Sequence, residues 1–171
     1  MNIDKIKSIL PILGVPSENE GIIWEPLHSK IGFSFPKIYI EFIENYGTGS
    51  INNFFWIINP FSTNSSLSLD QSFYFLEAYS NLKDDFPEYY TRDVKLFFPW
   101  GFTDNGDSIV WSIDDSDPDQ WSVIIQSSDP SIEETTDMTT VDFIEAILNN
   151  TLESSILPQD FLESKKTFQS I

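Results

Sequence analysis

The sequence predicts an α+β fold in which helices pack on one side of a mostly antiparallel sheet. Apolar residues recur at helical spacing in four separate segments of the 171-residue chain. Between the third and fourth segments, residues 96–126 hold three short apolar runs divided by turn-forming residues, a pattern typical of an antiparallel meander. Helices that precede and follow such a meander bury their apolar stripes against a face of its sheet.

Two helices and a strand are expected in the first part of the chain. Apolar residues at helical spacing predict a first helix that ends near Leu10, because Pro11 cannot continue it. The segment FPKIYIEFIENYG predicts a second helix, with Pro36 at its first position and Gly47 as its C-terminal stop. The aromatic run FFWII at residues 54–58 indicates a buried strand.

A third helix and the meander follow a polar loop at residues 61–68. Ser68 and Gln71 have the spacing of a capping box, so they predict a helix that begins there and ends before Pro87. This helix carries Leu69, Phe73, Leu76 and Tyr79. The runs LFFPW, SIVWSI and WSVIIQ are the expected strands of the meander.

The first two strands of the meander should form a hairpin from Leu96 to Ile113. Its turn contains Asn105-Gly106, and Asn-Gly is the strongest short-range signal for a hairpin. The favoured two-residue turn requires positive φ, so Asn105 or Gly106 should have it.

The chain is expected to fold as one domain. Thr139 and Asp142 open a last helix over residues 141–148. No repeat and no long linker divides the sequence. Residues 1–152 should therefore form a single α+β domain, followed by a C-terminal tail at 153–171 that is either docked or loose.

Composition excludes several classes of protein. The chain has no cysteine, which excludes a disulfide scaffold, a zinc finger, a thiol nucleophile and an iron–sulfur site. No apolar run reaches 18 residues, and the N-terminus lacks the apolar core of a signal peptide. The expected compartment is therefore the cytoplasm, with no membrane association.

The charge of the chain is strongly negative. Nine lysines and arginines oppose 27 aspartates and glutamates, which gives a net charge of −18. Such a surface repels phosphate backbones, so direct binding to nucleic acid is not expected. Between Leu96 and Ser164 there are 15 carboxylates and no lysine or arginine. This asymmetry either keeps the protein soluble or steers a basic partner towards it.

Motifs of common enzymes are not found. His28 is the only histidine, and no nucleophile motif surrounds it. The nearest match to a nucleophile elbow, residues 47–51, lacks the final glycine. No phosphate-binding glycine loop is present. A hydrolase that uses two carboxylates stays open as an alternative, because the distance between them decides it.

A calcium loop is considered for the segment DDSDPDQ. Asp115, Asp117 and Asp119 have the spacing of its first three ligands, but Gln120 replaces the required glycine and Gln126 the terminal glutamate. A hydrated acidic turn accounts for the segment better. No metal and no cofactor are expected.

Aromatic residues and carboxylates together predict a binding surface. Trp56 and Trp111 lie in apolar runs and should fill the core. Trp100 and Trp121 lie at strand ends beside turns, where an indole can be half exposed and anchor a partner. The carboxylates of the same turns are the other candidate partner-binding residues: Asp104, Asp107, Asp114, Asp115, Asp117 and Asp119.

Two stretches resemble signatures of the SUKH superfamily. FPKIYIEFIENYGTGSI is similar to its helix-to-strand signature, with Phe35 in place of the usual leucine. FPWGFTDNGDSIVW is similar to its second signature, which has an aromatic followed by glycine, an Asn-Gly-Asp turn and a tryptophan-bearing strand. The matching positions there are Trp100, Gly101, Gly106 and Asp107. The resemblance runs from about Trp24 to Leu148, and its strong parts cover a fifth of the chain.

The resemblance implies a function in binding rather than catalysis. Bacterial members of this superfamily are mostly immunity proteins, which bind and block toxin domains that are often nucleases. The matching residues would shape the turn and the sheet edge. The expected partner is therefore a basic toxin domain. The alternative is a regulatory scaffold for an endogenous partner, as in the fungal branch of glucan-synthesis regulators.

Overall fold

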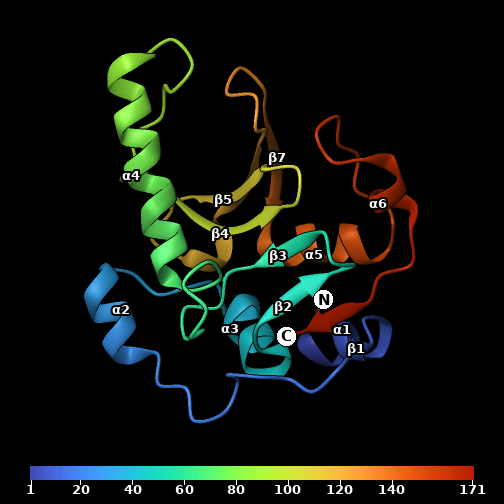
Figure 1. Cartoon of the computed structure of the whole chain (residues 1–171). Coiled ribbons are helices and arrows are strands. Elements are labelled where there is room, and N and C mark those ends of the chain that lie inside the picture. The colour runs from blue at the N-terminus through green and yellow to red at the C-terminus, as the bar shows by residue number, and fades with distance from the viewer.

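A computed structural model describes all 171 residues and shows a single eight-stranded sheet with six helices around it (Figure 1). The strand order is β1-β8-β2-β3-β4-β5-β6-β7, and every pair is antiparallel except β1 and β8. The α+β class and the mostly antiparallel sheet are thus confirmed. The strands are β1 (Ile12–Leu13), β2 (Gly49–Ile51), β3 (Phe55–Ile57), β4 (Phe97–Thr103), β5 (Ser108–Ser112), β6 (Ser122–Gln126), β7 (Glu133–Thr139) and β8 (Phe168–Ser170).

The helices predicted from the sequence all form. The complete set is α1 (Ile3–Ile9), α2 (Glu25–Ile31), α3 (Lys37–Tyr46), α4 (Leu69–Asp85), α5 (Thr140–Leu148) and α6 (Gln159–Glu163). Their N-terminal caps explain where two of them begin. The Ser68 hydroxyl accepts the Asp70 N–H at α4, and the Thr139 hydroxyl accepts the Asp142 N–H at α5. None of the helices combines the length and apolarity that crossing a bilayer requires.

The predicted hairpin is β4 and β5, joined by a turn at residues 104–107. Gly106 has φ +85°, which confirms the expected positive φ at this turn. The Thr103 N–H donates to the Asp107 carbonyl and the Gly106 N–H to the Thr103 carbonyl, so the turn is closed by its own backbone. The hairpin continues into β6 and β7 as an antiparallel meander.

Helices cover both faces of the sheet. The main core of 28 buried residues lies on the face covered by α1, α3 and α5. α4 packs on the opposite face, where Tyr79 contacts Phe97, Val110 and Ile124 in a separate small core (Figure 1). The expectation that helices lie on one side thus fails for α4. Its physical cause is that β4, β5 and β6 are apolar on both faces, and each apolar face must be covered.

The C-terminal tail is docked. β8 lies between β1 and β2, and Phe168 is fully buried against Phe42 and Tyr46 of α3. The two ends of the chain therefore meet at one edge of the sheet (Figure 1). Residues 153–171 complete the sheet and are continuous with the core of residues 1–152.

Candidate protein-binding surface

The structure separates the two acidic turns that the sequence suggested as one surface. Residues 104–107 connect β4 to β5, whereas residues 113–121 connect β5 to β6. The two turns therefore lie at opposite ends of the five-residue strand β5, roughly 17 Å apart at the usual rise per residue. A partner that touches both turns must span the full length of β5.

In the β5–β6 turn, three of the predicted carboxylates organise the backbone. Asp115 accepts the Asp117 N–H at 2.8 Å, and Asp117 accepts the Asp119 N–H at 3.1 Å. Asp119 accepts the Lys37 N–H at 2.6 Å and so caps the first turn of α3. Asp114 makes no such bond, and all four side chains are exposed. These carboxylates shape the loop and still present their charge to solvent.

In the β4–β5 turn, the two predicted carboxylates differ. Asp104 is exposed, and it accepts the Trp56 indole N–H at 2.6 Å. Asp107 is only 3% exposed; it accepts the Thr103 hydroxyl at 2.7 Å and the Ser128 N–H at 3.1 Å. The prediction that Asp107 contacts a partner is therefore wrong. Its carboxylate instead ties this turn to the β6–β7 turn, because a buried charge needs hydrogen-bond donors.

The two tryptophans predicted as anchors are core residues. Trp100 is 1% exposed and Trp121 is 2% exposed, so neither can contact a partner in this fold. The Trp100 ring stacks on Trp111 with 5.3 Å between centroids, and the Trp121 indole N–H donates to the Asp115 carbonyl at 2.7 Å. Both side chains belong to the main core. Trp100 lies in the middle of β4, which continues three residues beyond the predicted strand end, whereas Trp121 directly precedes β6.

The remaining tryptophans of the meander and of β3 were predicted to fill the core. Trp111 is fully buried, as predicted. Trp56 is only partly buried, because its two strand neighbours Phe55 and Ile57 point into the core and alternation sends Trp56 to the other face.

The acidic charge is largely uncompensated. Of the 15 carboxylates between Leu96 and Ser164, only Glu133 and Glu145 form ion pairs, with Arg92 and with Lys5 and the N-terminus. The others accept hydrogen bonds from neutral donors or face solvent. Negative charge therefore projects from several sides of the β4–β7 half of the molecule.

Exposed aromatic residues gather on α4 and the turn after it, a surface that sequence reasoning missed. Tyr74 is 67% exposed and Phe73 is 38% exposed. Acidic residues alternate with the aromatic ones along this segment. The α4 surface comprises Phe73, Tyr74, Leu82, Phe86 and Tyr89 with Asp70, Glu77, Asp84, Asp85 and Glu88. Adjacent aromatics at positions 73–75 were the available signal, because one helical stripe cannot bury three consecutive residues.

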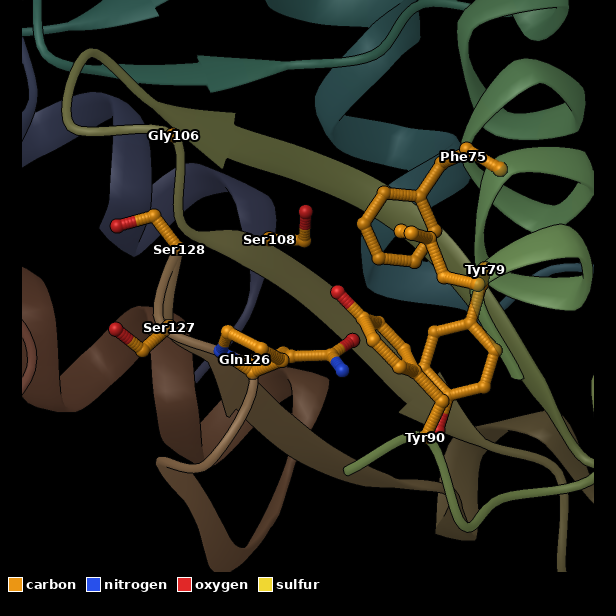
Figure 2. A pocket seen from close by; sticks show the side chains of 11 residues that line it. Phe75, Tyr79, Tyr90, Gly106, Ser108, Gln126, Ser127 and Ser128 are labelled. Carbon is orange, nitrogen blue, oxygen red and sulfur yellow. The ribbon is translucent and has the colours of Figure 1, made fainter. Parts of the chain in front are cut away.

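A pocket lies between α4 and the sheet (Figure 2). Its volume is about 140 Å³. Phe75 and Tyr79 of α4 and the nearby Tyr90 form one side of it, and Ser108 and Gln126 of the sheet form the other. The pocket is thus aromatic on one wall and polar on its floor.

The titratable groups with shifted pKa are engaged in hydrogen bonds. Burial acts to raise the pKa of Glu18, but hydrogen bonds from Thr48 and Thr63 outweigh it and lower this pKa to about 2. Burial likewise opposes the hydrogen bonds of Ser154 and Ser155, which lower the pKa of Glu134. No group of three or more side chains is arranged to hold a metal ion. These carboxylates serve as acceptors that join segments of the fold.

Comparisons with known proteins give no relative from which to carry over a function. The chain matches no protein-family model, no curated protein and no solved structure. Its function is therefore inferred from the charge, burial and geometry of the chain itself.

Proposed function

We propose that this chain is a non-enzymatic protein-binding domain, an immunity protein that binds and neutralises a basic bacterial toxin domain. The observation that carries the proposal is the acidic half of the molecule. Only two of its 15 carboxylates pair with cations, and only Asp107 is buried. A nuclease that grips phosphate groups presents a basic cleft, and carboxylates can occupy such a cleft in place of phosphates.

The binding surface combines charge with apolar contacts. Exposed carboxylates attract a basic partner over several ångströms and speed its association. The apolar contacts that slow dissociation come from the α4 surface, because Trp100 and Trp121 are buried. Tyr74 and Phe86, which are 67% and 48% exposed, are the aromatic residues best placed for this role.

The resemblance to the SUKH superfamily supports the same proposal. The first motif, residues 35–51, lies on α3 and β2, and the second, residues 98–111, lies on the β4–β5 hairpin. Gly106 and Asp107 close the hairpin turn, which agrees with a role for this motif in shaping the fold.

A charge-neutralised variant tests the steering component. Replacing Asp114, Asp115 and Asp117 by asparagine removes three charges and keeps the side-chain oxygens that accept the loop N–H groups. We expect association with the purified toxin to slow about three- to tenfold at low salt, and wild-type association to slow as salt rises. Stopped-flow fluorescence measures both rates.

The matched control removes the same charge from another part of the surface. Asp4, Glu20 and Glu25 are exposed and lie outside the acidic segment, so Asp4→Asn, Glu20→Gln and Glu25→Gln together should change the rate much less. Equal slowing in the two triple variants would show that only net charge matters. A rate indifferent to salt and to both variants would end the steering hypothesis.

The immunity function has its own test. The tagged chain is used to capture partners from the source organism, and each captured protein is expressed alone and together with this chain. The proposal expects one captured protein to arrest growth and this chain to restore it. If no captured protein is toxic, or if coexpression fails to restore growth, the immunity proposal is wrong.

A further inference from the structure

The pocket under α4 begins where the apolar face of the sheet becomes polar. On that face Val110 of β5 pairs with Ile124 of β6, and both pack under Tyr79. Two residues further along the same face, the next pair is Ser108 and Gln126. The apolar pair is covered by α4, whereas the polar pair forms the floor of the pocket.

The polar groups in the pocket have no partners within the chain. The Gln126 side chain is 8% exposed and Ser108 is 6% exposed, yet the Gln126 amide and the Ser108 hydroxyl make no hydrogen bond to another residue. The Tyr90 hydroxyl also lacks one. The polar atoms of these side chains are open to the pocket, so they are free to bind a ligand or water. Figure 2 shows Gln126 reaching from the sheet towards the aromatic side chains.

The electrostatic surroundings favour a cation. No lysine or arginine lines the pocket. Lys83 and Arg92 lie close in sequence to the lining residues Leu82 and Tyr90, but both are occupied. Arg92 is bound by Glu133, and the Lys83 ammonium donates to the carbonyls of Thr91 and Arg92. Asp129 lies between two lining residues, Ser128 and Pro130, and it is exposed.

We propose that this pocket receives the guanidinium group of an arginine side chain from the basic partner. That the arginine comes from a basic toxin domain rests on the function proposed above. A volume of about 140 Å³ is smaller than the roughly 300–1,000 Å³ of small-molecule sites. It suits one inserted side chain.

Arginine fits better than lysine because its flat, delocalised cation stacks on aromatic rings and presents five N–H donors in a plane. The rings of Phe75, Tyr79 and Tyr90 offer such faces, and the oxygens of Gln126, Ser108 and Tyr90 offer acceptors.

Binding of a small arginine probe tests the pocket without the toxin. N-acetyl-arginine methylamide is titrated into the full-length ¹⁵N-labelled protein, and NMR shifts are followed. We expect saturable shifts centred on the Gln126 side-chain amide and the backbone of residues 106–108 and 126–128, with a dissociation constant on the order of millimolar. The citrulline analogue, which is nearly the same shape without the charge, and the lysine analogue should each bind at least about tenfold more weakly.

Two variants assign the shifts to the pocket. Gln126→Leu and Tyr90→Phe each remove an acceptor and should weaken the arginine probe several-fold. Gln120→Leu is the matched control for Gln126→Leu, because it replaces an exposed glutamine outside the pocket. It should leave the affinity of the protein for the arginine probe unchanged. Thermal melting establishes that each variant is folded.

Several results would overturn the assignment: no saturable shift, shifts centred elsewhere, equal binding of citrulline or lysine, or unchanged affinity in both pocket variants. Because no toxin is present, these results leave the immunity proposal standing. Conversely, if this chain fails to restore growth but binds the arginine probe, the immunity proposal is wrong and the pocket is still an arginine-binding site.

Discussion

Phe168 should be essential to stability even though it lies only three residues before Ile171, the last residue of the chain. Its ring is fully buried and packs edge-on against the stacked rings of Phe42 and Tyr46, at centroid distances of 5.6 and 5.1 Å. Replacing a buried phenylalanine by alanine costs about 3–5 kcal/mol, from lost transfer free energy and the cavity left behind. For a domain of this size each kcal/mol lowers the melting temperature by about 2–4 °C, so Phe168→Ala should lower it by about 6–20 °C.

The cavity that Phe168→Ala leaves cannot collapse easily, because the backbone around it is tightly packed. β8 is hydrogen-bonded to β1 on one side and β2 on the other. At Gly49 of β2, an added Cβ would lie 2.1 Å from the Gln169 carbonyl oxygen, so the strands are already in the closest contact. The loss should therefore fall in the upper part of the range.

Urea unfolding followed by tryptophan fluorescence measures the change in the free energy of unfolding. Ile171→Ala is the matched control, because Ile171 is in the same tail and 53% exposed; its effect should stay within about 0.5 kcal/mol. If Phe168→Ala costs less than about 1 kcal/mol, the tail is not docked in solution and the placement of β8 is wrong.

Two further predictions concern pH. Glu18, whose pKa is about 2 in the folded protein against 4.5 unperturbed, stabilises the fold above pH 4.5, and this contribution is lost as pH falls from 4.5 towards 2. Glu18→Gln should therefore make the acid-induced loss of stability shallower in urea titrations, and an unchanged slope would contradict the lowered pKa. Burial lowers the pKa of Lys166 from 10.5 to about 8. Between these values the unfolded chain holds a proton that the folded chain has lost, so stability should rise with pH. Lys166→Met should abolish this rise between pH 8 and 10.5, and an equal rise in both proteins would refute it.

Sequence patterns predicted the elements whose apolar residues have a clear period. α1, α3, α4 and α5 and the strands of the meander lie where spacing and turn residues placed them. The missed elements lack such a pattern. β7 reads EETTDMT and is an edge strand with alternating exposure but hardly any apolar side chains. β1 and β8 have two and three residues, and their pairing joins opposite ends of the chain. No local signal encodes such a long-range pair.

The candidate site was harder to predict, because side-chain direction depends on the fold. The sequence located the excess of carboxylates, and the predicted meander already placed its two turns at opposite ends of the middle strand, so the hypothesis of one shared surface conflicted with the predicted fold. The sequence also did not show that β4 continues past Trp100 to Thr103, so Trp100 was expected at a half-exposed strand end although it is buried in the middle of the strand. The pocket under α4 depends on Tyr90, Ser108 and Gln126, which come from different elements and share no motif.

The aspartates of the β5–β6 turn can both order the loop and attract a basic partner. The choice of substitution decides which of these two roles an experiment measures. Asp115 and Asp117 each hold a backbone N–H, while their second oxygen and their charge face solvent. Alanine at these positions would remove the loop's hydrogen bonds together with the charge, so a slower association would have two causes. Asparagine removes the charge alone, because its carbonyl oxygen accepts the same N–H. A difference between the asparagine and alanine variants in association rate would therefore measure what loop order adds to binding, separately from the field.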